Sequence, residues 1–113
     1  DCSGLVQTCM NLIGFRFPRD AKDQVNSKLL YEIKLKDIFS GDLLFFEENN
    51  LVNHVGIAIN SFDNLDYHGE IIHSSGSVKI SKIVFDDMFY GTVDGNDDQK
   101  IKLYKIMRIK ENV

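Results

Sequence analysis

The spacing of apolar residues changes once along this chain, and that change restricts the possible folds more than any other feature. Near the N-terminus the apolar residues follow the three-and-four spacing of an amphipathic helix. These residues are Leu5, Val6, Cys9, Met10, Leu12 and Ile13. Beyond residue 40 the apolar residues form short runs or alternate with small and polar ones, as strands do. The sequence therefore predicts one helix followed by an antiparallel sheet, an α+β domain.

The predicted helix covers residues 2–15, with Asp1 as its N-cap and Gly14 as its stop. Cys9 lies mid-helix among apolar residues, and we expect it to lie in the core. Residues 17–26 contain the chain's one proline, so we expect a loop there with about one turn of helix, close to the first helix.

Four later segments predict strands. Residues 43–46, LLFF, follow a turn signal and are too short for a helix, so we interpret them as a buried strand. In residues 53–60, NHVGIAIN, one face carries Val55, Ile57 and Ile59, and the other is nearly bare. Something must pack closely on the bare face, and the first helix is one candidate. Residues 70–80 predict a hairpin that turns at 74–76, and residues 101–109 predict a last strand.

Two polar segments between these strands predict loops. The first, residues 61–69, reads SFDNLDYHG, and the second, residues 86–99, is acidic and contains glycine. The paired aspartates of the second loop are interpreted as solvated surface rather than as acid/base catalysts. No glycine-rich phosphate-binding loop of a standard spacing is present.

Length and charge exclude several classes of protein. A chain of 113 residues with 43% apolar and 27% charged residues is typical of one globular domain. The net charge is −4 and no Lys/Arg cluster stands out, which argues against nucleic acid as a partner. The apolar runs are far shorter than the roughly 18 residues of a membrane span.

The two cysteines are seven residues apart on the predicted helix, which separates their Cα atoms by about 10.5 Å. That distance is too long for a disulfide. The cysteine and histidine spacings also lack the pattern of a zinc site, so we expect no metal.

Cys2 and His54 are the residues best placed for nucleophilic chemistry. Cys2 lies in the first turn of the helix, where free backbone N–H groups and the helix dipole favour a thiolate. The alternative is that Cys2 is a small buried hydrophobe. His54 begins the strand with the bare face, so a helix packed there brings it within reach of Cys2 as a general base. A structural histidine is the alternative.

A second histidine is expected to orient His54. His73 ends the next strand, from which it can hydrogen-bond the second ring nitrogen of His54 and fix its tautomer. His68 is the rival for this role, but it lies in the polar loop, so we favour His73.

Five motifs in order extend through nearly the whole chain. They are Asp1-Cys2-Ser3-Gly4-Leu5, Pro18-Arg19-Asp20-Ala21 with Gln24, Gly41-Asp42-Leu43-Leu44-Phe45-Phe46, His54-Val55-Gly56-Ile57 and Ile72-His73-Ser74-Ser75-Gly76. In this order they resemble the NlpC-type cysteine peptidases of bacterial cell walls. The Pro-Arg-Asp-Ala and His-Ser-Ser-Gly segments look most like the branch that cleaves between γ-D-glutamate and the diamino acid of peptidoglycan peptides.

The resemblance implies a papain-like core, with the helix that bears the nucleophile packed on the sheet. It makes Cys2 the nucleophile, His54 the general base and acid, and His73 the orienting residue, with no cofactor. Asp1 and Ser3 match positions that hold the free amino end of the L-Ala-γ-D-Glu stem, where a carboxylate suits an ammonium group. For Arg19 we favour a loop-anchoring role over a carboxylate clamp.

The resemblance also leads us to expect residues 1–113 to be an NlpC-type domain truncated at its N-terminus. Relatives carry an upstream segment that lines the site, and often bacterial SH3-like domains before it. A periplasmic or extracellular location is slightly favoured over a cytoplasmic one. Two alternatives stay open: an idle module that binds the stem peptide, and an acyltransferase on the same fold.

Overall fold

The structure, a computed structural model, describes residues 1–63 and 67–110. It contains two α-helices, one 3₁₀ helix and seven strands within those residues. In chain order they are α1 (Cys2–Leu12), α2 (Ala21–Gln24), β1 (Leu30–Ile33), η1 (Leu35–Asp37), β2 (Leu43–Glu48), β3 (Leu51–Ala58), β4 (His68–Ser75), β5 (Ser77–Phe85), β6 (Tyr90–Val93) and β7 (Lys100–Ile109). The α+β prediction, a leading helix followed by an antiparallel sheet, is confirmed.

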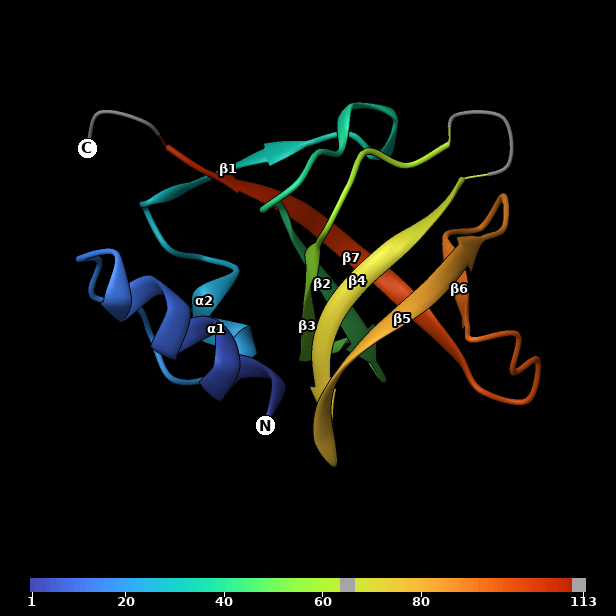
Figure 1. The fold of residues 1–113 in the computed structure, drawn as a ribbon, viewed down its shortest axis with the longest axis horizontal. Helices are drawn as coiled ribbons and strands as arrows, with labels where there is room; N and C mark the ends of the chain where they lie inside the picture. The colour runs from blue at the N-terminus through green and yellow to red at the C-terminus, as the bar shows by residue number, and fades with distance from the viewer. Residues whose placement is uncertain (64–66, 111–113) are drawn as a thin grey trace.

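The seven strands form one antiparallel sheet in the order β1-β7-β2-β3-β4-β5-β6. A further pairing joins β6 to the start of β7, so six of the strands close into a small barrel. Figure 1 shows the two helices together on one side of this sheet and the twisted β4–β5 hairpin crossing in front of the long strand β7. The helices therefore cover the outer face of one side of the barrel.

Two apolar clusters lie on opposite faces of the central strand β2. Leu43 and Phe45 pack with residues of α1 and α2, whereas Leu44 and Phe46 point into the barrel. All four side chains are buried. This explains why the strand is a continuous apolar run rather than an alternating one, as the sequence analysis expected of a buried strand.

Helix α1 begins at the predicted residue, but it is shorter than predicted and a different set of its residues faces the core. The Asp1 carboxylate caps it by accepting a hydrogen bond from the Gly4 N–H at 2.8 Å. The helix ends at Leu12, before the predicted stop. Its buried apolar residues, Cys2, Val6 and Met10, are four apart and form a narrow stripe.

The prediction that Cys9 lies in the core is wrong, because its side chain is exposed. In an α-helix each residue is turned about 100° from the next, so Cys9 is rotated that far from Met10 and out of the buried stripe. Leu12 is 81% exposed, also outside the stripe. The helix thus contacts the sheet along fewer residues than its apolar content suggested. Both cysteines are free thiols.

The first helix, a candidate to pack on the bare face of β3, does not lie there. The helix packs on the opposite face, where Val55 is fully buried in the cluster with Val6 and Met10. The bare face instead lines the barrel interior. A Cβ atom added to Gly56 would lie 3.0 Å from Ile71 Cδ1 of the neighbouring strand, so it is a β4 side chain that requires the small residue.

Three local predictions are refined by the structure. Residues 30–33 form a strand that the sequence analysis did not identify, and the predicted loop at 86–99 contains strand β6. His68, assigned to a polar loop, begins β4 instead. Of the predicted loop at 61–69, residues 64–66 lie outside the described residues. The one-turn helix in 17–26, the 74–76 turn of the hairpin and the last strand are present.

Candidate active site

The first turn of α1 places Cys2 against strand β3. The Cys2 side chain is 8% exposed, and its Sγ atom lies 3.9 Å from the backbone carbonyl oxygen of Asn53. An S–H···O contact of that length is weak. It nevertheless fixes where the sulfur is, beside the residue that directly precedes His54. Packing of α1 on β3 through Val6 and Val55 accounts for this approach.

The imidazole of His54 contacts that of His73. His54 Nε2 and His73 Nδ1 are 3.0 Å apart, and the two rings meet edge to face at 77°. The Phe46 ring, 5.7 Å away between centroids, packs on His54. Among the described residues, no hydrogen bond is made by the other nitrogen of His54, Nδ1. The contact expected between His54 and His73 is therefore present, and Nδ1 remains available to a thiol or a substrate.

Behind His73 lies a polar group that the sequence analysis missed. His73 Nε2 is 2.8 Å from the hydroxyl oxygen of Ser81, and both side chains are buried. The backbone N–H of Lys82, which donates to the Asp94 carboxylate at 3.0 Å, and then the nearby Ser81 hydroxyl lower the pKa of Asp94. A single serine in a strand of alternating polar and apolar residues does not by itself indicate a functional role. Only the pairing of β4 with β5 brings Ser81 to His73.

Burial lowers the pKa of both histidines. The pKa of His54 falls to about 4, chiefly because burial disfavours the charged ring and secondly because His73 is close. Burial and then the cation of Lys79 lower the pKa of His73, while Asp94 acts in the opposite direction. At neutral pH both imidazoles are therefore uncharged, and His54 can accept a proton.

A second polar cluster surrounds the N-terminus of α1. The guanidinium of Arg19 donates to the Ser3 hydroxyl at 3.0 Å and to the Asp1 carboxylate at 2.9 Å. Gln24 donates to the backbone carbonyls of Ser3 and Pro18. These contacts tie the loop after α1 to the start of the helix, in agreement with the loop-anchoring interpretation of Arg19. Asp1 and Ser3 thus lie on either side of Cys2 in the chain and share one cation.

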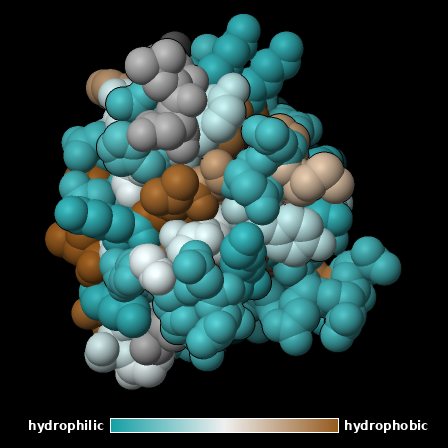
Figure 2. Space-filling view, turned by 90° about the vertical axis from the view of Figure 1, so that its right-hand side faces the viewer, coloured by the Kyte–Doolittle hydropathy of each residue, from teal (hydrophilic) through white to brown (hydrophobic). Residues whose placement is uncertain are grey.

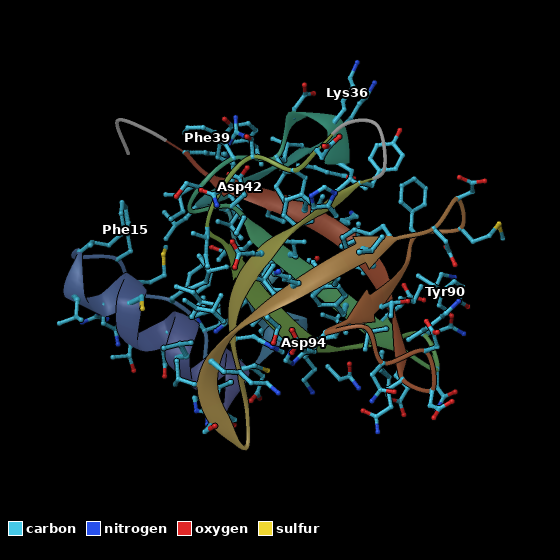
Figure 3. The ribbon with its side chains drawn as sticks, turned by 45° about the vertical axis from the view of Figure 1, so that its right-hand side comes forward. Phe15, Lys36, Phe39, Asp42, Tyr90 and Asp94 are labelled. Atoms are coloured by element: carbon cyan, nitrogen blue, oxygen red, sulfur yellow. The ribbon has the colours of Figure 1, made fainter. Side chains whose placement is uncertain are left out.

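A pocket of about 320 Å³ opens onto the two imidazoles and is also lined by Lys79 and Asp94. Figure 3 shows Asp94 beside the twisted β4–β5 ribbon, far from Asp42.

His68, the rival of His73, is at the opposite end of β4, where it pairs with Val84, so His73 is the histidine that reaches His54.

The described part of the chain shows no group of three or more His, Cys, Asp or Glu side chains placed to hold a metal ion. Within those same residues, no helix is long and apolar enough to cross a membrane. The face around β6, seen in Figure 2, is mainly hydrophilic with separate hydrophobic patches.

A cysteine at a helix N-terminus, packed against a sheet that carries two paired histidines, is an arrangement typical of cysteine peptidases. Comparison with known families agrees. The model of the NlpC/P60 family matches residues 1–94, and the chain belongs to that family, whose members are generally cell-wall peptidases.

Among solved structures, one similar to this chain is a lipoprotein-like protein of the NLP/P60 family from Staphylococcus aureus. The two superpose with a TM-score of 0.65 at 26% sequence identity, over 99% of this chain and 32% of the other. The chain therefore spans about a third of the length of that protein. No curated protein matches this chain.

Proposed function

We propose that this domain is a cysteine peptidase that hydrolyses the amide between γ-D-glutamate and the diamino acid of peptidoglycan peptides. The observation that carries the proposal is the His54–His73 pair at 3.0 Å, placed next to the carbonyl that the Cys2 thiol contacts. Family membership supports a peptidase of the cell wall, and the motifs around Arg19 and His73 favour this bond. We place the activity in the periplasm or outside the cell.

In the proposed reaction, His54 Nδ1 takes the proton of the Cys2 thiol as the sulfur attacks the amide carbonyl carbon. The tetrahedral intermediate carries its negative charge on the former carbonyl oxygen, to which the backbone N–H of Cys2 donates. When the C–N bond breaks, the leaving amine receives the proton from His54. A water molecule, deprotonated by His54, then cleaves the thioester and restores the Cys2 thiol.

The low pKa of His54 leaves the ring neutral at physiological pH, so a ring nitrogen can accept the thiol proton. However, a pKa of about 4 makes it a weaker base than the pKa of about 7 that suits general-base catalysis. His73 acts as the orienting residue by holding Nε2 of His54. Because Sγ of Cys2 lies 3.9 Å from the backbone carbonyl oxygen of Asn53, the reaction requires the thiol to leave this contact and approach Nδ1 of His54.

Asp1 and Ser3 are proposed to bind the free amino group of the L-Ala-γ-D-Glu stem. Asp1 is exposed, so one carboxylate can face an ammonium group while it caps α1. Ser3 is buried and contributes its hydroxyl oxygen from beneath. Arg19 already neutralises part of the Asp1 charge, so its guanidinium must shift or share the carboxylate when the substrate binds.

The proposal is tested with a synthetic L-Ala-γ-D-Glu-diamino acid peptide and analysis of the products. Cys2→Ala and His54→Ala should each lower kcat by about a thousandfold or more, since each removes a member of the reacting pair. Cys9→Ala, on the exposed side of the same helix, should cleave like the wild type. Cleavage that survives in either active-site variant, with the fold intact by circular dichroism, contradicts the proposal.

One observation favours a second candidate, a module that binds the stem peptide without cutting it. The Cys2 thiol contacts the Asn53 carbonyl rather than the imidazole of His54. An idle module should bind the peptide in calorimetry and leave it intact on long incubation. A peptidase should bind it and release two products.

A further inference from the structure

The first half of strand β5 has an edge that no strand covers. Strand β6 pairs with β5 only at residues 83–85, and among the described residues no other strand lies along that side of β5. The other side of β5 pairs with β4 from Ser77 to Val84. Figure 1 shows the closed end of the β4–β5 hairpin extending beyond β6. Residues 77–81 therefore form an open edge of the sheet, which we call the β5 edge.

The hydrogen bonds of Lys82 show which backbone groups of the β5 edge point outward. Its N–H donates to the Asp94 carboxylate at 3.0 Å, and its carbonyl accepts from the Asp94 N–H at 2.8 Å, so both groups point away from β4. Backbone groups alternate in direction along an antiparallel strand, so those of Ile80 and Val78 point the same way as those of Lys82. Two N–H groups and two carbonyl groups thus point out of the sheet, where no described strand pairs with them.

The side chains of the β5 edge lie on two faces of the sheet. Val78 and Ile80 are each 60% exposed on the outer face. Lys79 lies between them on the inner face, where it lines the pocket of about 320 Å³ together with His54 and His73. A chain paired with this edge therefore sets two of its side chains beside Val78 and Ile80, and the side chain between them beside Lys79 at the pocket.

We propose that the β5 edge binds an extended segment of a protein partner, with an acidic residue opposite Lys79 and an apolar residue on either side. The segment adds a strand to the sheet through hydrogen bonds to the N–H and carbonyl groups of Val78 and Ile80. Between two such hydrogen-bonded pairs, the Cβ atoms of the opposed residues are about 4.5–5.5 Å apart, so a carboxylate there meets the Lys79 ammonium. The inference does not depend on the proposed peptidase function.

Two other occupants fit the β5 edge less well. If a second copy of this chain paired antiparallel through Val78 and Ile80, Lys79 would lie directly opposite its counterpart, and like charges in that position are destabilising. Lysine on an edge strand commonly prevents such pairing. The stem peptide lacks the regular backbone that strand pairing requires, because the γ-linkage of its D-glutamate inserts extra carbon atoms into the main chain.

The test is NMR titration of the ¹⁵N-labelled protein with the blocked peptide Thr-Val-Glu-Val-Thr. In the free protein, the amides of Val78 and Ile80 should exchange rapidly with solvent, whereas that of Lys79, which points to His73 on β4, should exchange slowly. Saturating peptide should slow the exchange of the Val78 and Ile80 amides by about tenfold or more. The same peptide methylated on both valine nitrogens lacks the donors and should bind about tenfold more weakly.

Two substitutions test the backbone and the charge separately. Ile80→Pro removes an N–H that the sheet does not use, so the fold should persist while peptide binding is lost. Its control, Ile80→Thr, keeps the N–H and should change the affinity by less than about threefold.

Lys79→Glu should reverse the charge preference of the edge. The wild type should bind the glutamate peptide about fivefold more tightly than the same peptide with a central lysine, and the variant should prefer the lysine peptide by a similar factor. This exchange of preference tests the proposal even if Ile80→Pro fails to fold.

Four results would overturn the proposal. The first two are equal affinity of the wild type for both peptides, and unprotected Val78 and Ile80 amides at about 10 mM glutamate peptide. Protection that grows with protein concentration in the absence of peptide would show that a second copy occupies the edge. Stronger protection of a Cys2→Ala variant by the stem peptide than by the glutamate peptide would assign the edge to the substrate.

Discussion

His54 and His73 lie on neighbouring antiparallel strands and meet edge to face, with Nε2 of the first 3.0 Å from Nδ1 of the second. The register pairs Ile57 with Ile72, and extended by one residue it sets His73 opposite Gly56. His54 is two residues from Gly56 on the same face, so the histidines are diagonal neighbours, a spacing that ring side chains can bridge.

The first prediction concerns the relative reactivity of the two thiols. At pH 6 an ordinary exposed thiol is only about 0.3% ionised and reacts slowly with iodoacetamide. His54 is still neutral at that pH and can take the proton of Cys2 during the attack. We therefore expect Cys2, although buried, to be alkylated at least tenfold faster than the exposed Cys9, as followed by mass spectrometry of the digested protein.

His54→Ala should reduce the alkylation rate of Cys2 to that of Cys9 or below. The buried thiol is then less accessible to the reagent than Cys9, and no base remains to take its proton. Cys2→Ser is the control that assigns the fast-reacting site. Equal, slow alkylation of both thiols in the wild type would favour the idle binding module.

The second prediction is a loss of stability in acid that is due to the buried histidines. In the unfolded chain His54 has the ordinary pKa of 6.5, and in the folded protein the pKa is about 4. Between these values the unfolded state binds more protons, so the free energy of unfolding falls as the pH falls from 6.5 to 4. The full effect of His54 is on the order of 3 kcal/mol, and the lowered pKa of His73 acts in the same direction.

Urea unfolding measured at several pH values between 4 and 7 checks this. The variant His54→Gln, which cannot be protonated, should show a shallower dependence of unfolding free energy on pH. If the wild type and His54→Gln lose stability in parallel, His54 is not neutral in the folded state.

The third prediction separates binding by Asp1 from its role as a helix cap. Asparagine caps helices about as well as aspartate, so Asp1→Asn should leave the stability of α1 unchanged. It removes the charge that faces the substrate ammonium, and KM for the stem peptide should rise about tenfold with kcat little changed. A peptide whose amino end is acetylated should give the same KM for both proteins. A KM unaffected by Asp1→Asn with the free peptide argues against an amine site here.

The fourth prediction concerns the ion pair between Asp42 and Arg108. The guanidinium donates to both carboxylate oxygens at 2.8 Å, and the Phe39 N–H also donates to this carboxylate. Since Asp42 is 2% exposed, Arg108→Met leaves a buried charge without its partner and should destabilise the protein by about 3–5 kcal/mol in urea.

The matched control is Lys105→Met, which removes the exposed pair with Glu32 at 3.9 Å and should cost less than about 1 kcal/mol. Asp42 lies well away from Asp94 (Figure 3), which lines the same pocket as the two histidines, so the folded fraction of Arg108→Met should keep the wild-type kcat. A similar destabilisation by both substitutions would show that burial of Asp42 does not matter.

Local pattern was enough to predict the elements that carry the site. The helix cap at Asp1, the buried strand at 43–46 and the hairpin that turns at 74–76 each depend on short-range preferences, and each is present. The strand at 90–93 was missed because a segment of four residues with one buried member has almost no periodic signal.

What the sequence determined by itself was therefore the kinds of element, their order and a short set of reactive residues around Cys2 and His54. Which face of β3 the helix covers, and which serine stands behind His73, were decided only by the tertiary structure. The physical reason is that both depend on strand pairing and barrel closure, which bring together residues far apart in the chain. Alternation along one strand shows that two faces differ, but it does not say which neighbour each face will meet.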